Sequence, residues 1–91
     1  EVLQDIDKLD FVFFDGNHRK VPTMNYFNQC LTKAHEGSVF IFDDIYWSSE
    51  MKEAWKEIKN HPRVKITIDL FQFGIVFLKS GQAKEHFVIK F

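Results

Sequence analysis

Three aspartates stand directly after two of the most apolar segments of the chain. Residues 11–14 are followed by Asp15, and residues 39–42 are followed by Asp43 and Asp44. A helix-length segment separates the two runs, so we expect two buried strands that lie parallel. Their carboxyl ends then meet at one edge of a sheet, outside which open α/β sheets bind ligands. We therefore expect the three carboxylates on the rim of an active site.

A helix is expected between the two strands. We place the first strand at about residues 10–15. Thr23 can cap the helix and Pro22 is tolerated in a first turn, so we expect the helix to open at residues 21–23. Apolar residues then recur at helical spacing as far as Gly37, which is a suitable stop.

The second strand, at about residues 38–43, leads into another helix. Ser48 or Ser49 can cap this helix, and Glu50 is favourably placed in its first turn. Apolar residues follow at the spacing of one helix face. Pro62 marks the end of the helix.

Two further strands are expected to complete the sheet. Residues 65–70 alternate strictly, as does a strand with one wet face or at a sheet edge, whereas residues 74–78 are continuously apolar, as in an interior strand. Only residues 71–73 separate them, so we expect an antiparallel hairpin with its second strand inward. The predicted order is first, second, fourth, third. The alternating apolar residues at 87–91 either add a short strand or dock on the surface.

Right-handed crossovers place both helices on one face of such a sheet. Phe11, Phe13, Val39 and Ile41 then point to the other face, which this chain leaves without cover. Exposing each of them would forgo about 1.5–3 kcal/mol. We expect an upstream segment of the same protein to cover this face, or alternatively self-association. Residues 1–91 are thus interpreted as a single partial domain.

Composition excludes several classes of protein. The 91 residues are 45% hydrophobic, include eleven Phe and carry a formal charge of −1. That charge gives no footprint for nucleic acid and no polybasic signal for a membrane surface. Cys30, the single cysteine, cannot form an internal disulfide and falls on the buried stripe of its helix. We expect a cytoplasmic protein.

The order and spacing of these motifs resemble a known family. The segments are Phe11-Val-Phe-Phe-Asp-Gly-Asn-His18 and Gly37-Ser-Val-Phe-Ile-Phe-Asp-Asp44, followed by a helix and a terminal hairpin. Over roughly residues 8–79 they are similar to the C-terminal half of class I S-adenosylmethionine-dependent methyltransferases, closest to small-molecule O-methyltransferases. The resemblance implies a Rossmann-like α/β half-domain, with parallel strands, a C-terminal antiparallel hairpin and both helices on one face.

The resemblance also implies a function. The parent protein would transfer a methyl group to an oxygen or nitrogen of a small-molecule acceptor. The family's glycine-rich loop, which binds S-adenosylmethionine, belongs to the N-terminal half, and the four glycines of this chain do not form it. We therefore expect the isolated chain to bind S-adenosylmethionine weakly or not at all, and to be inactive.

Residue roles on the rim follow from the same resemblance. Asp15, Asp43 and Asp44 match the positions that hold a divalent cation in cation-dependent members, although Asp44 stands where those have Asn. Three carboxylates suit a hard cation such as Mg²⁺. The alternative is that they cap local structure or contact substrate directly.

His18 stands where the cation-dependent enzymes carry a lysine base. A histidine titrates closer to neutrality, so His18 and Asp15 are the predicted catalytic residues. The alternative is a loop histidine without a chemical role. Arg19 could steer an anionic substrate or be a solvated cation. Tyr46 and Trp47 could wall a flat substrate, or simply pack where the second helix begins.

Two other interpretations stay open. A receiver-like domain also gathers acids at strand ends, but it would place the acidic pair on an earlier strand than the acceptor Asp. A non-catalytic α/β assembly module would need no chemistry on the rim. Met51 and Trp55 belong to a helical stripe and are assigned to the core under every interpretation.

Overall fold

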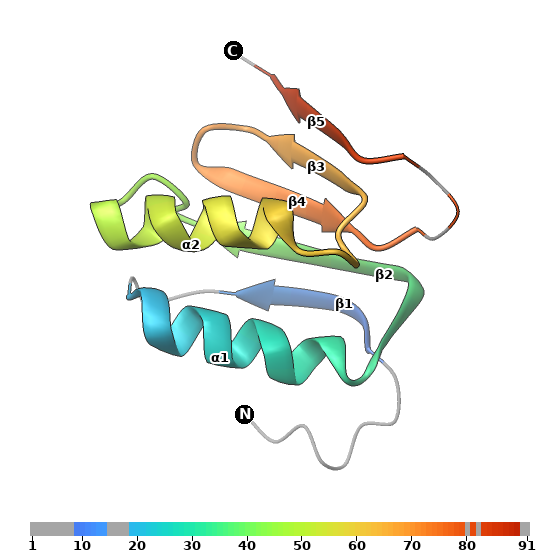
Figure 1. The fold of residues 1–91 in the computed structure, drawn as a ribbon. Coiled ribbons are helices and arrows are strands. Elements are labelled where there is room, and N and C mark those ends of the chain that lie inside the picture. Colours follow the sequence, from blue (N-terminus) through green and yellow to red (C-terminus); the bar gives the residue numbers. More distant parts are fainter. Residues whose placement is uncertain (1–8, 15–18, 80, 82, 90–91) are drawn as a thin grey trace.

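The apolar runs of the sequence pair into one mixed sheet that carries two helices (Figure 1). A computed structural model describes residues 9–14, 19–79, 81 and 83–89 of the chain. In chain order the elements are β1 (Leu9–Phe14), α1 (Lys20–Leu31), β2 (Ala34–Asp43), α2 (Ser49–Asn60), β3 (Ile66–Asp69), β4 (Phe73–Phe77) and β5 (Glu85–Val88).

The sheet has the order β1-β2-β4-β3-β5. Strands β1 and β2 are parallel, and β4 is antiparallel to both β2 and β3. This confirms the predicted order of the first four strands, with the second hairpin strand inward. The C-terminal segment takes the first of its two predicted alternatives, because β5 pairs in parallel with β3.

Both helices cover the same face of the sheet, as expected from right-handed crossovers (Figure 1). Phe27 of α1 and Trp55 of α2 both pack against Phe42, with ring centroids 5.8 Å and 6.2 Å away. The apolar strand residues buried on this face are Val12, Phe14, Phe40, Phe42 and Val76. Cys30, Met51 and Trp55 are also buried, which confirms their assignment to the core.

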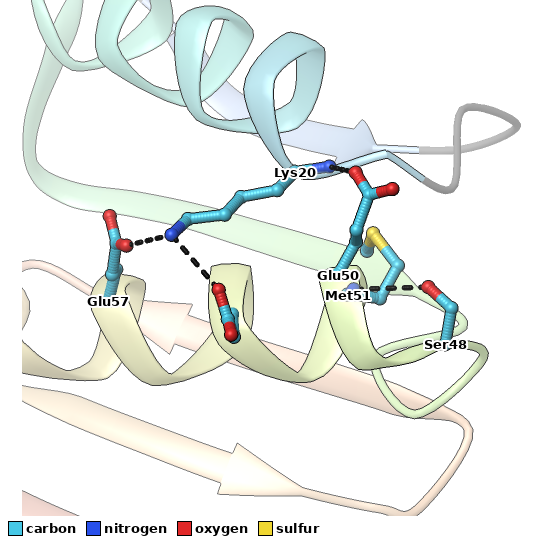
Figure 2. A network of polar contacts seen from close by, with 6 residues as sticks. Lys20, Ser48, Glu50, Met51 and Glu57 are labelled. Carbon is cyan, nitrogen blue, oxygen red and sulfur yellow. Dashed lines mark hydrogen bonds and ion pairs between the residues drawn. The ribbon is translucent and has the colours of Figure 1, made fainter.

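The N-termini of the two helices are joined by polar contacts (Figure 2). The Ser48 hydroxyl accepts a hydrogen bond from the backbone N–H of Met51, so Ser48 is the cap of α2. A carboxylate oxygen of Glu50 accepts from the backbone N–H of Lys20, at 3.0 Å. The Lys20 ammonium also pairs with Glu53 and Glu57 of α2. These contacts fix the two helices side by side on the sheet.

The first helix begins at Lys20, one residue before the expected opening, but its predicted cap and its predicted end were wrong. Arg19 is the N-cap of α1, and Thr23 lies inside the helix, where its hydroxyl contacts the sulfur of Met51. The helix ends at Leu31, and Gly37 belongs to β2, which begins four residues before the predicted position. Thr32 closes the last turn, because its N–H and its hydroxyl both donate to the Gln29 carbonyl.

Strand β3 also departs from the sequence pattern. Its polar residues Thr67 and Asp69 are buried, whereas Ile66 and Ile68 are only half-buried on the other side. The alternation that predicted one wet face therefore places the polar side chains inward. Nor is β3 an edge strand, since it lies between β4 and β5.

The second face of the sheet is apolar and carries no described helix. Its side chains follow the strand register in two rows, Phe11, Val39, Phe77 and Ile66, then Phe13, Ile41, Ile75, Ile68 and Phe87. Phe11 is 61% exposed and Phe13 is 44% exposed. We call this surface the open face. Its apolar character confirms the predicted division of strand residues between the two faces.

Candidate functional site

Two predicted catalytic residues, Asp15 and His18, lie outside the residues that the structure describes. Their roles, and the cation site built on Asp15, stay predictions. Within the described ranges no group of three His, Cys, Asp or Glu side chains is placed to hold a metal ion. The site is therefore built from the remaining rim residues.

The two acids after β2 lie in different surroundings. Asp43 is paired with Phe73 in the register of β2 and β4, on the side of the sheet that carries Ile41. Asp44 has left the strand and has a positive φ of 58°. It lines a cavity together with Tyr46, Trp47, Phe71 and Gln72. Asp43 is not among the described residues that line this cavity.

We call this hollow the rim cavity, defined by Asp44, Tyr46, Trp47, Phe71 and Gln72. It has a volume of about 200 Å³ and lies at the carboxyl end of β2, where the turn between β3 and β4 meets the segment before α2. The structure thus brings together three of the residues singled out on the sequence. Their contact with a substrate stays a prediction.

Backbone hydrogen bonds hold the two walls of the rim cavity together. The N–H of Asp44 donates to the carbonyl of Gln72 at 2.8 Å, which links the segment after β2 to the β3–β4 turn. The N–H of Trp47 donates to the Asp44 carbonyl at 3.0 Å. Gln72 in turn donates its N–H to the Leu70 carbonyl. These hydrogen bonds therefore fix the backbone of the residues that line the rim cavity.

Asp69 holds two aromatic residues of the rim cavity, Tyr46 and Phe71, through hydrogen bonds. Its carboxylate accepts the hydroxyl of Tyr46, and its second oxygen accepts the N–H of Phe71 at 2.9 Å. Burial raises the pKa of Tyr46 to about 12, and the hydrogen bond and the negative charge of Asp69 act in the same direction. Tyr46 is thus a neutral donor at physiological pH, and its ring is held in place.

Two residues of the rim cavity have strained backbones. Asp44 (φ 58°) and Phe71 (φ 71°) are the non-glycine residues with positive φ within the described ranges. This conformation costs about 1–3 kcal/mol for such a residue and is concentrated at functional sites. The strain is tolerated because hydrogen bonds to Gln72 and Asp69 hold the backbone on both sides.

Arg19, the predicted anion-steering residue, is exposed at the N-cap of α1. It does not line the rim cavity. Sequence reasoning missed Phe71, Gln72 and Asp69. The available signal was the short β3–β4 connection, which we used only to assign a hairpin. An acid is followed there by two aromatic residues in a tight turn at the rim, and this pattern is typical of residues that line a site.

No family model matches the chain, and no match is found among curated proteins or solved structures. Within the part of the chain that the structure describes, neither helix has the length and apolar character needed to cross a bilayer. The site is therefore interpreted from its own geometry.

Proposed function

We propose that this chain is the C-terminal part of a Rossmann-like, class I S-adenosylmethionine-dependent methyltransferase domain. The observation that supports it most is the sheet topology: β4 is inserted antiparallel between β2 and β3, beside the parallel pair β1 and β2. The two helices on one face agree with the same arrangement. The substrate is a small molecule with a nucleophilic oxygen or nitrogen.

The proposed reaction is a single displacement. The acceptor atom, positioned at the carboxyl edge of the sheet, attacks the methyl carbon as the bond from that carbon to the sulfonium sulfur breaks. The acceptor's proton passes to His18, or a divalent cation on the rim would polarise the acceptor and lower its pKa. Most of the acceleration comes from orientation and electrostatics, because no covalent enzyme intermediate is needed.

The test uses the parent protein and S-adenosylmethionine with a labelled methyl group. We expect transfer to a small hydroxylated or amino acceptor. Asp15→Ala and Asp43→Ala should each reduce turnover by orders of magnitude and leave the circular dichroism spectrum unchanged. Glu36→Ala is the matched control, because Glu36 is exposed at the start of β2, away from the carboxyl edge. Wild-type turnover in both Asp variants would remove these residues from the mechanism.

A cofactor titration tests the division of the domain. Calorimetry of the 91-residue chain with S-adenosylmethionine should show weak binding or none, because the glycine-rich loop is not in this chain. Micromolar binding would contradict the assignment to a C-terminal half.

A non-catalytic assembly module is the second candidate, and the open face favours it. Contiguous apolar patches above a few hundred Å² are rare on monomers and mark interaction surfaces. Under this proposal the residues of the rim catalyse no reaction, and substitutions there leave assembly unchanged. Sedimentation of Phe11→Ser and Phe13→Ser variants tests it, since loss of a complex formed by the wild type would support an assembly role.

A further inference from the structure

Three aromatic residues and one acid line the rim cavity, and none of the described residues that line it is cationic. We propose that the rim cavity binds a small organic cation, specifically an alkylammonium group such as a methylated amine. Aromatic faces attract such cations within about 6 Å of the ring centroid, and clusters of aromatic rings recognise quaternary ammonium groups.

Two of the three rings are largely exposed. Trp47 is 65% exposed and Phe71 is 70% exposed, although both stand on defined backbone. Tyr46 and Phe71 lie against one another with centroids 5.8 Å apart and planes 31° apart. Together with Trp47 they supply three aromatic rings to the lining of one small hollow.

The charges nearby favour a cation. Asp44 is part of the wall, and the buried carboxylate of Asp69 lies directly behind the Tyr46 hydroxyl. A phenol that donates to a carboxylate has a more electron-rich ring, which strengthens its attraction for a positive charge. An anionic ligand would meet repulsion from both acids instead.

Size and rigidity narrow the ligand further. The volume of about 200 Å³ is below the roughly 300–1,000 Å³ of pockets that hold drug-sized ligands, so the cavity suits a head group. The positive φ of Asp44 and Phe71 and the bond from Asp44 to Gln72 set the walls before any ligand arrives. A preformed site loses less entropy on binding.

Binding of the cation does not depend on methyl transfer. That the bound amine is also the methyl acceptor rests on the proposed function. In that case the acceptor would be an amine presented at the carboxyl edge of β2.

The experiment compares choline with its neutral carbon isostere, the dimethylbutanol in which a tert-butyl group replaces the trimethylammonium group, by NMR titration of the 91-residue chain. The indole N–H signal of Trp47 reports on the cavity, and that of the buried Trp55 serves as an internal reference. We expect saturable shifts at Trp47 with choline, and binding of dimethylbutanol weaker by about tenfold. Equal affinity for the two ligands, or no saturable shift with choline, would overturn the proposal.

Two variants test the wall. Phe71→Leu keeps an apolar residue but removes a ring, and Asp44→Asn removes the charge with a residue that tolerates positive φ. Each should weaken choline binding about threefold to tenfold. The matched control is Phe87→Leu, an exposed aromatic on β5 outside the cavity, which should bind like the wild type. Unchanged affinity in folded Phe71→Leu and Asp44→Asn proteins would overturn the assignment to this cavity.

The two proposals fail separately. If the parent protein methylates acceptors but choline does not bind at Trp47, the cation site is wrong and the methyltransferase proposal stands. If choline binds with the expected variant pattern but no acceptor is methylated, the methyltransferase proposal is wrong and the cation site stands.

Discussion

The two faces of the sheet carry similar side chains in opposite surroundings. On the helix-covered face, Phe14 and Phe42 stack with centroids 4.1 Å apart, and Phe40 is fully buried. On the open face, Phe11 and Phe13 come from the same strand as Phe14 and remain exposed. The alternation of a strand assigns neighbouring residues to different faces, but it does not supply what covers them.

Strand β3 makes this comparison more informative. It turns Thr67 and Asp69 to the covered face and Ile66 and Ile68 to the open one. A strand whose open side faced only water would be expected to have the reverse pattern. The open face is thus built as an interior surface. Of the four predictions below, the first compares the two faces directly, and the others test the packing, the helix cap and the pH dependence of the fold.

The largest difference should appear between Phe40→Ala and Phe11→Ala. Loss of Phe40 removes a fully buried ring and leaves a cavity, so unfolding free energy should fall by about 3–5 kcal/mol. Loss of the exposed Phe11 should change it by less than about 1 kcal/mol. Urea unfolding of both variants measures this. Equal losses would mean that the two faces are equally buried in solution.

A smaller loss is expected from Gly74→Ala on the covered face. A Cβ at Gly74 would lie 2.4 Å from the nearest ring carbon of Trp55, whose side chain is rigid and buried. Overpacking of this kind costs about 1–3 kcal/mol. The same change in a Trp55→Leu background should cost less, because the ring is gone. If Gly74→Ala lowered the free energy of unfolding equally in both backgrounds, the loss would come from the strand backbone and not from contact with the Trp55 ring.

Ser48→Ala tests how the second helix is started. The Ser48 hydroxyl satisfies the N–H of Met51, and its loss should reduce stability by about 1 kcal/mol. The neighbouring Ser49→Ala is the control, since Ser49 is exposed in the first turn and is not the cap. Thermal unfolding should separate the two variants by a few degrees, and matching transitions would contradict the cap.

The smallest expected effect is the pH dependence of stability that two histidines cause. Burial lowers the pKa of His61 and of His86, with nearby cations adding to it. The unfolded chain then binds more protons than the folded one, so stability is fully present above about pH 6.5 and is lost as pH falls through the lower folded values. Urea midpoints from pH 7.5 to pH 5 should decrease, and less steeply in a His61→Gln/His86→Gln variant. An equal slope in both proteins would exclude these histidines.

Much of the candidate site was accessible from local patterns. Asp44, Tyr46 and Trp47 follow a recognisable strand end, and they do line one cavity. Phe71 and Asp69 were missed because their role depends on contacts across the sheet: a hydrogen bond from Tyr46 to Asp69 and a close ring pair between Tyr46 and Phe71. No local pattern states which distant segment a turn residue meets.

The sequence by itself determined the existence and order of the first four strands and the hairpin, and it narrowed the cap of α2 to Ser48 or Ser49. These features depend on hydrophobic period, capping residues and connection length, which act within a few residues of chain. Only the tertiary structure decided that Thr67 and Asp69 turn inward, that Asp43 and Asp44 separate, and that three aromatic residues enclose a hollow. Those outcomes depend on pairing between distant segments, where burial and hydrogen bonding to a remote partner override local preference.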